Sequence, residues 1–125
     1  NCQTYNKKKK LLLDLNNKSK YFEETLNKFI DDNNLDLKVY RYASIIRIVF
    51  TKNKVINRVQ RDFFESRISS KINSFRKYLF LKNIYYPTSG IIFFSFLSSY
   101  SNINYVIKFI KTGFNKFFLK KNLLS

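Results

Sequence analysis

The sequence predicts an α+β protein, of one domain or two small lobes, in which helices combine with short strands. Apolar residues recur at helical spacing in two segments, residues 19–32 and 101–111. Short apolar or alternating runs, which are typical of strands, lie between and beside these segments. A chain of 125 residues with 45% hydrophobic and 18% aromatic content is also long enough to bury a modest core.

The amino-terminal lobe is expected to span residues 1–65 and to begin with a basic arm. Lys7–Lys10 form that exposed arm, and the leucines of residues 11–15 are predicted to form a short buried strand. Ser19 is placed to cap the first helix. The polar run "DDNN" then ends this helix near residue 32.

A hairpin should follow that helix. Residues 35–39 alternate between apolar and polar side chains, and "SIIRIVF" is a second strand. "VINRV" is expected to return after the turn "TKNK". The polar side of this hairpin would carry Arg47, Lys52, Lys54 and Arg58.

The carboxy-terminal lobe, residues 66–125, is predicted to be built around a strand, a serine-rich turn and a helix. Residues 61–83 fit either a helix or a strand, a loop and a strand. Irregular structure with a strand near 75–81 is favoured, because "ISSKINS" disfavours a helix. A loop surrounds the single proline, Pro87, and Gly90 starts a strand that runs to residue 96.

The last helix of this lobe is expected to start at Ser101 as its N-cap. Gly113 stands where a left-handed residue ends a helix, and a short strand and a basic end should follow. One face of the helix is apolar, with Ile103, Val106, Ile107 and Ile110. The opposite face is polar, with Asn104, Lys108 and Lys111.

The charge distribution points to a polyanionic partner. The chain has 24 Lys and Arg residues but only eight Asp and Glu residues, which gives a net charge of +16. All the acids lie between Asp14 and Glu65, so residues 66–125 have cations but no acids of their own. RNA or DNA is the first candidate to neutralise these cations, and an anionic membrane surface is the second.

The composition argues against an enzyme. The chain has no His, and Cys2 is its only Cys, which removes the usual zinc, iron–sulfur and disulfide sites and nucleophilic triads. Adjacent Asp31 and Asp32 fit a polar helix end. We therefore expect no catalytic residue, cofactor, metal or small-molecule substrate. The longest apolar stretch, residues 91–97, is shorter than the ~18 residues of a membrane span, so no membrane insertion is expected.

The serine-rich turn is the candidate RNA contact that the residues themselves indicate. Free backbone N–H groups at a helix N-terminus and small hydroxyl side chains suit a phosphate or a ribose 2′-OH. Tyr100 beside them can stack on a base or sugar, and Asn102 and Lys108 flank the turn. The serines gathered there are Ser95, Ser98, Ser99 and Ser101.

The order of these segments resembles a known family. "SKYFEETLNKFIDDNN", "LDLKVYR", "SIIRIVF", "RISS", "GIIFFSFLSS" and "SNINYVIKFIKTG" follow one another as in the small-subunit ribosomal protein S-eight family. The resemblance covers about residues 7–120, and the family's first helix is mostly missing. Its identities are Ser19, Lys20, Gly90, Ile91, Ser95 and Gly113.

This resemblance implies an α+β fold of two small lobes, each with a helix and short strands, whose sheets pack together. It also implies a structural, non-catalytic protein that binds the central domain of small-subunit rRNA and aids its assembly. Neighbouring ribosomal proteins would be further partners. Abundant Lys, Asn, Ile, Phe and Tyr indicate an A/T-rich genome, so the ribosome would be mitochondrial, or that of a plastid-type organelle. The resemblance and the charge pattern together give these RNA-binding candidates: Ser95, Ser98, Ser99, Tyr100, Asn102, Lys108, Lys111, Lys18, Lys20, Lys7, Lys8, Lys9, Lys10, Lys54 and Arg58.

Three alternatives remain open. "IRIVF" and "IYYPTS" resemble parts of the small-subunit S-ten family over less of the chain. A peripheral subunit of an organellar membrane complex would instead turn its basic face to anionic lipid. A free-standing RNA-binding regulator is the third.

Overall fold

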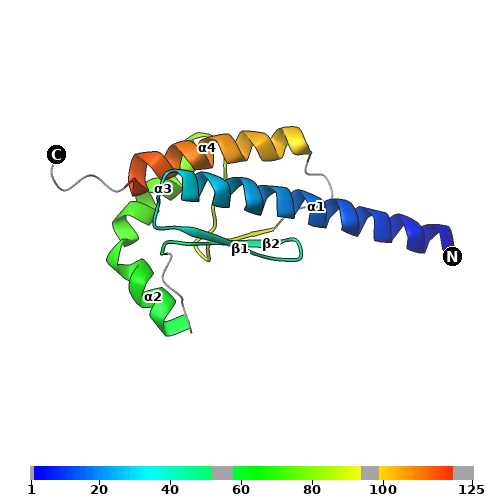
Figure 1. Ribbon diagram of the computed structural model, residues 1–125, viewed down its shortest axis with the longest axis horizontal. Helices are drawn as coiled ribbons and strands as arrows, with labels where there is room; N and C mark the ends of the chain where they lie inside the picture. Colours follow the sequence, from blue (N-terminus) through cyan, green and yellow to red (C-terminus); the bar gives the residue numbers. More distant parts are fainter. Residues whose placement is uncertain (1, 52–57, 94–98, 120–125) are drawn as a thin grey trace.

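A three-stranded antiparallel sheet and two long helices that lie side by side over one of its faces form the body of the molecule (Figure 1). The structure is a computed structural model, and it describes residues 2–51, 58–93 and 99–119. The elements are α1 (Cys2–Asp32), β1 (Lys38–Tyr42), β2 (Ile45–Val49), α2 (Arg58–Arg67), α3 (Ser69–Leu81), β3 (Ile91–Phe93) and α4 (Tyr100–Phe118). The predicted α+β class is confirmed.

Alternation along the strands gives the sheet a buried face. The strand order is β1-β2-β3, with Val39 opposite Ile48 and Ile46 opposite Ile92. Val39, Ile46 and Ile48 are buried under the helices. Asn27 of α1 binds the free edge of β1, because its amide donates to the Val39 carbonyl and accepts from the Val39 N–H, both at 2.9 Å.

Helix α1 is much longer than the predicted helix, and the predicted strand at residues 11–15 is wrong. Lysine and leucine are both good helix formers, so the basic arm and the leucines continue the helix. This part of α1 extends past the body in Figure 1, and Leu11, Leu12 and Leu13 are exposed. The end is as predicted: Asn34 takes φ 55°, and the Leu35 N–H donates to the Ile30 carbonyl at 2.9 Å.

Ser19 is not a cap but a buried contact in the middle of α1. Its hydroxyl lies 2.9 Å from the Asn16 carbonyl and 2.8 Å from the Ala43 carbonyl, and it donates to these oxygens. Ala43, at φ 54°, belongs to the turn that joins β1 to β2. The hairpin therefore turns at residues 43–44. The predicted returning strand is wrong where it is described, because Arg58 and Val59 start α2; residues 52–57 lie outside the described part.

Residues 61–83 are mostly helical, which corrects the irregular structure and strand predicted there. In α3, Ile72, Phe75 and Leu79 recur at helical spacing and are buried. Burial of this stripe outweighs the weak helix propensity of the serines, which is only about 0.5 kcal/mol each. The loop around Pro87 is as predicted, and Gly90 takes φ 75° before β3.

Helix α4 starts and ends elsewhere than predicted. Ser99, not Ser101, is the N-cap, because its side chain accepts from the Asn102 N–H at 3.1 Å. The helix continues through Gly113 to Phe118, so the predicted helix end and final strand are wrong. Gly113 instead lets α4 approach α3, since a Cβ there would lie 2.6 Å from Cε1 of Phe75.

One cluster of buried side chains joins both halves of the chain. It takes Phe22, Leu26 and Ile48 from the first half and Phe75 and Phe114 from the second, among others. The division into two lobes near residue 65 is not confirmed.

Candidate nucleic-acid interface

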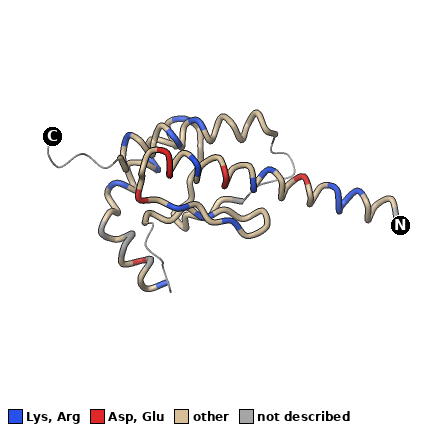
Figure 2. Tube along the Cα trace, viewed as in Figure 1, with Lys and Arg blue, Asp and Glu red and all other residues tan. Residues whose placement is uncertain are grey.

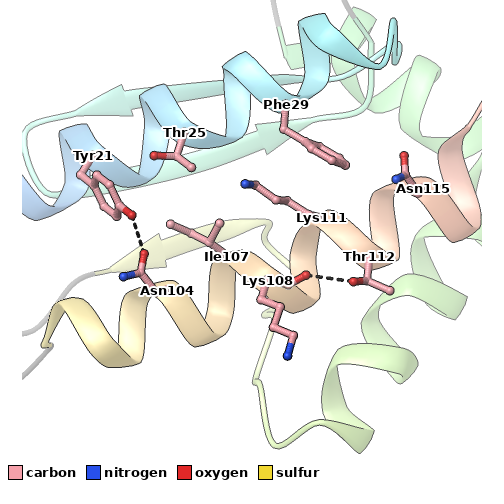
Figure 3. Close-up of a pocket in the computed structure, with 9 residues that line it drawn as sticks. All are labelled: Tyr21, Thr25, Phe29, Asn104, Ile107, Lys108, Lys111, Thr112 and Asn115. Atoms are coloured by element: carbon pink, nitrogen blue, oxygen red, sulfur yellow. Dashed lines mark hydrogen bonds between the residues drawn. The ribbon is translucent and has the colours of Figure 1, made fainter.

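The two long helices leave a groove between them on the side away from the sheet (Figure 3). Its volume is about 420 Å³. Polar and basic side chains make up most of its lining, which suits a charged ligand better than an apolar one. The lining residues are Tyr21, Thr25 and Phe29 of α1 and Asn104, Ile107, Lys108, Lys111, Thr112 and Asn115 of α4.

Two lysines provide the charge of this groove. The Lys111 Nζ lies 5.5 Å from the centre of the Phe29 ring, and the Lys108 Nζ lies 5.6 Å from the centre of the Phe109 ring. In Figure 3, Lys111 reaches toward α1, whereas Lys108 points away from it. A ring contact orders an ammonium group without neutralising it. Both charges therefore remain open to an anion.

A hydrogen bond joins the two walls of the groove at one end. The Tyr21 hydroxyl donates to Oδ1 of Asn104 across a sequence separation of 83 residues (Figure 3). Farther along α4, the Thr112 hydroxyl donates to the Lys108 carbonyl at 3.0 Å. The groove is therefore a fixed feature of the helix pair, with amide and hydroxyl groups beside its cations.

The N-terminus of α4 carries part of the predicted serine site. The Ser99 hydroxyl oxygen accepts from the Asn102 N–H, so this oxygen caps the N-terminus of α4. Tyr100 is 45% exposed, and its ring meets the edge of the Tyr21 ring at 5.5 Å. The structure therefore brings Tyr100 next to α1 and the groove. Three of the other candidates, Ser95, Ser98 and Lys54, lie outside the described residues.

The predicted cations of α1 fall into two groups. Lys18 is buried, its Nζ lies 2.8 Å from Oδ2 of Asp14, and its side chain is only 11% exposed. Its charge is thus compensated within the helix. Lys20 is open to solvent, and its contact with Glu24 is long, at 3.9 Å. Lys7–Lys10 are all exposed on the protruding part of α1.

Arg58 lies apart from the groove. It is the first residue of α2, which lies at the opposite end of the molecule from the protruding part of α1 (Figure 1). Its Nε is 3.7 Å from Oδ2 of Asp62, and both side chains are exposed. Arg58 was predicted on the polar side of a hairpin strand, but it lies in a helix and not beside the other candidates.

The described ion pairs all belong to the first half of the chain. Among the side chains that the structure describes, none of the cations of α3 and α4 is within ion-pair distance of a carboxylate. Figure 2 shows the same division, with no acidic residue along α4. The described surface of α3 and α4 therefore carries uncompensated positive charge.

Sequence reasoning missed the α1 wall of the groove. Tyr21, Thr25 and Phe29 are spaced four residues apart, which places them on one stripe of a helix. Asn104 was assigned to the polar face of its helix but not to the site. The missing information was which stripe of α1 meets which stripe of α4, and this depends on packing between distant segments.

Comparisons with known proteins do not assign the chain to a family. No model of a known protein family matches the sequence, and no curated protein sequence matches it. Over residues 2–51, 58–93 and 99–119, no helix combines the length and apolar character needed to cross a membrane. In the same residues, no three His, Cys, Asp or Glu side chains gather as a metal site would require.

Proposed function

We propose that the protein binds RNA as a non-catalytic structural component, and that this RNA is small-subunit ribosomal RNA of an organelle, mitochondrial first. The observation that carries the proposal is the uncompensated charge of α3 and α4, part of which lines a polar groove. A fixed set of cations without carboxylates favours a fixed polyanion over mobile counterions.

The groove suits the backbone of folded RNA. Lys108 and Lys111 supply charges for phosphates, and Asn104, Thr112 and Asn115 supply amide and hydroxyl groups for the 2′-OH. Contacts of this kind fix position and read shape, and they carry little base specificity. A protein that helps to hold rRNA in place needs this mode of binding.

The protruding part of α1 supports a place for this protein within a larger assembly. Lys10 and Lys7 lie eight and eleven residues before Lys18, which is about 12 and about 17 Å along a helix. The exposed leucines at positions 11–13 follow the lysines directly. Lysines and leucines together on one projecting helix suit a place between an RNA backbone and a neighbouring protein.

The ribosomal part of the proposal rests on the resemblance to the S-eight family. Two lobes, the rRNA central domain and the neighbouring ribosomal proteins come from that resemblance alone. The α+β class and the segment order around Gly90 agree with it, whereas the helical course of residues 61–81 and 113–118 departs from the expected pattern.

A charge-reversal pair tests RNA binding through the groove. The double variant Lys108→Glu/Lys111→Glu should bind structured RNA much more weakly than the wild type. The slope of log K against log salt should also fall by about 1 for each lost phosphate contact. The matched control is Lys71→Glu/Lys77→Glu, which changes the net charge equally at exposed positions of α3.

The outcomes separate the candidates. A large loss for the α4 variant and a small loss for the α3 variant support the groove. Equal losses indicate diffuse charge attraction and remove the groove assignment. If the wild type binds vesicles of anionic lipid but no RNA, the proposed function fails and the peripheral membrane-complex alternative takes its place.

A further inference from the structure

The sheet has a second face that the two long helices do not cover. Because side chains alternate along a strand, Tyr40 and Tyr42 of β1 point away from the face that holds Val39. Tyr42 is 82% exposed and Tyr40 is 45% exposed. Figure 1 shows α1 and α4 together on the other side of the hairpin. We call this surface, made of Lys38, Tyr40, Tyr42, Ile45, Arg47 and Ile91, the open face.

The strand register fixes how the open face is laid out. Tyr42 lies opposite Ile45, and Tyr40 lies opposite Arg47, which in turn lies opposite Ile91. Directly opposed side chains are about 5 Å apart at Cβ, so Arg47 stands between a tyrosine and an isoleucine. Val49, on the same face, is only 4% exposed, so the accessible tyrosines lie toward the end near the β1–β2 turn. Lys38, opposite Val49 at the other end, is itself exposed.

The charge of the open face is positive and uncompensated. No Asp or Glu occurs in β1, β2 or β3, all of which are described. Arg41 points to the helix side, where its Nε lies 3.5 Å from Oε1 of Glu23. The described ion pairs include neither Lys38 nor Arg47, and the Arg47 Nε is buried with no hydrogen-bond partner in the described structure.

We propose that the open face binds an unpaired stretch of RNA, with two bases stacked on Tyr40 and Tyr42 and the backbone held by Arg47 and Lys38. The tyrosines are two residues apart, about 6.7 Å along the strand, so two bases of an extended chain can lie on them in turn. Aromatic rings beside cations on an acid-free surface complement bases joined by phosphates. This inference rests on the proposed function and adds to it a second contact, on the side opposite the groove.

Unpaired RNA suits the open face better than an RNA duplex or a second copy of this chain. In a duplex the bases stack on each other and offer no free ring face to a tyrosine. A second copy of this chain would bring Lys38 and Arg47 of both copies together, and like charges facing each other oppose association. An unpaired RNA segment meets both the rings and the charges.

The test uses fluorescence anisotropy with a labelled, unstructured RNA of eight uridines and with a short RNA duplex. Tyr42→Ala and Tyr40→Ala should each weaken binding to the single strand by about 5- to 100-fold. Tyr42→Phe keeps the ring and should bind within about twofold of the wild type. The matched control is Tyr85→Ala, since Tyr85 is 80% exposed but lies outside the sheet.

Salt dependence separates stacking from charge. Tyr42→Ala should lower the affinity without changing the slope of log K against log salt, whereas Lys38→Gln should reduce the slope by about 0.7. The far-ultraviolet circular dichroism of each variant checks the fold. Tyr42 lies at the exposed end of β1, so its truncation leaves the core intact.

The outcomes distinguish this inference from the proposed function. If the wild type binds both RNAs and the tyrosine variants bind the single strand as Tyr85→Ala does, the open face is not the site, and the proposed function stands. If the wild type binds neither RNA, the proposed function fails and the inference fails with it. Self-association of the wild type that Tyr42→Ala abolishes assigns the face to a second copy and overturns the inference.

Discussion

Gly113→Ala tests the closest approach between α3 and α4. The glycine is buried in the middle of α4, and an added Cβ would lie 2.6 Å and 2.8 Å from Cε1 and Cδ1 of Phe75. Carbon atoms pack best at about 3.5–4.0 Å, so the methyl group overlaps the ring by close to 1 Å. Phe75 cannot swing away easily, because its ring packs against those of Phe50, Tyr86, Phe114 and Phe118.

Two opposing effects set the size of the change. Alanine is favoured over glycine within a helix by about 1 kcal/mol. Overpacking a tight core contact costs about 1–3 kcal/mol or more, and a rigid neighbour places this site at the upper end. We therefore expect Gly113→Ala to lower the free energy of unfolding by about 1–2 kcal/mol, which corresponds to a fall in Tm of about 3–10 °C.

Thermal and urea unfolding followed by circular dichroism measure the effect. Asn115→Ala is the matched control, since it also adds an alanine to α4 but at an exposed position, and it should be neutral or slightly stabilising. Phe75→Leu removes the ring atoms that crowd position 113, so the double variant should lose less stability than the sum of the single changes. A rise in stability on Gly113→Ala, as expected for an uncrowded helical glycine, would refute the close packing.

The other predictions concern the turn between β1 and β2 and the start of α4. Ser19→Ala removes the hydroxyl that donates to the Ala43 carbonyl and should destabilise by about 1 kcal/mol in urea unfolding; an unchanged midpoint would show that this contact contributes nothing. Ala43→Gly relieves φ 54° and should raise Tm slightly, whereas a clear loss would place Ala43 in an ordinary backbone region. Ser99→Ala removes the cap that accepts from the Asn102 N–H and should cost about 1 kcal/mol, and the same change at Ser101 should cost little if Ser99 is the true cap.

The spacing of apolar residues was sufficient to predict the helices that bury a continuous apolar stripe. The helical spacing predicted within residues 19–32 is that of Phe22, Leu26 and Ile30, and all three are buried, as are Ile107 and Ile110 of the predicted apolar face of α4. The same approach failed where two signals competed. In α3, serines and asparagines suggested irregular structure, but burial of its apolar stripe decided the outcome.

Single residues misled where their role depends on a distant partner. Gly113 was predicted to end a helix, yet its lack of a side chain makes room for the ring of Phe75, 38 residues earlier in the chain. Ser19 was predicted as a cap, yet its hydroxyl serves a turn 24 residues later. Such contacts follow from tertiary packing and leave no local pattern.

The candidate site was only partly visible in the sequence for the same reason. The cations and the acid-free residues 66–125 were plain in the sequence. The groove, however, depends on how α1 and α4 pack side by side, with Tyr21 and Asn104 joined across them. The open face likewise requires knowing that both long helices pack on the other side of the sheet.

Sedimentation of the native protein, from a detergent lysate of its source cells with and without RNase, tests the central claim most directly. Binding to small-subunit rRNA predicts that the protein travels in a particle of small-subunit size and moves to the top of the gradient after RNase treatment. A protein that stays in the same particle after RNase, or travels with a membrane complex, would contradict RNA binding as its function.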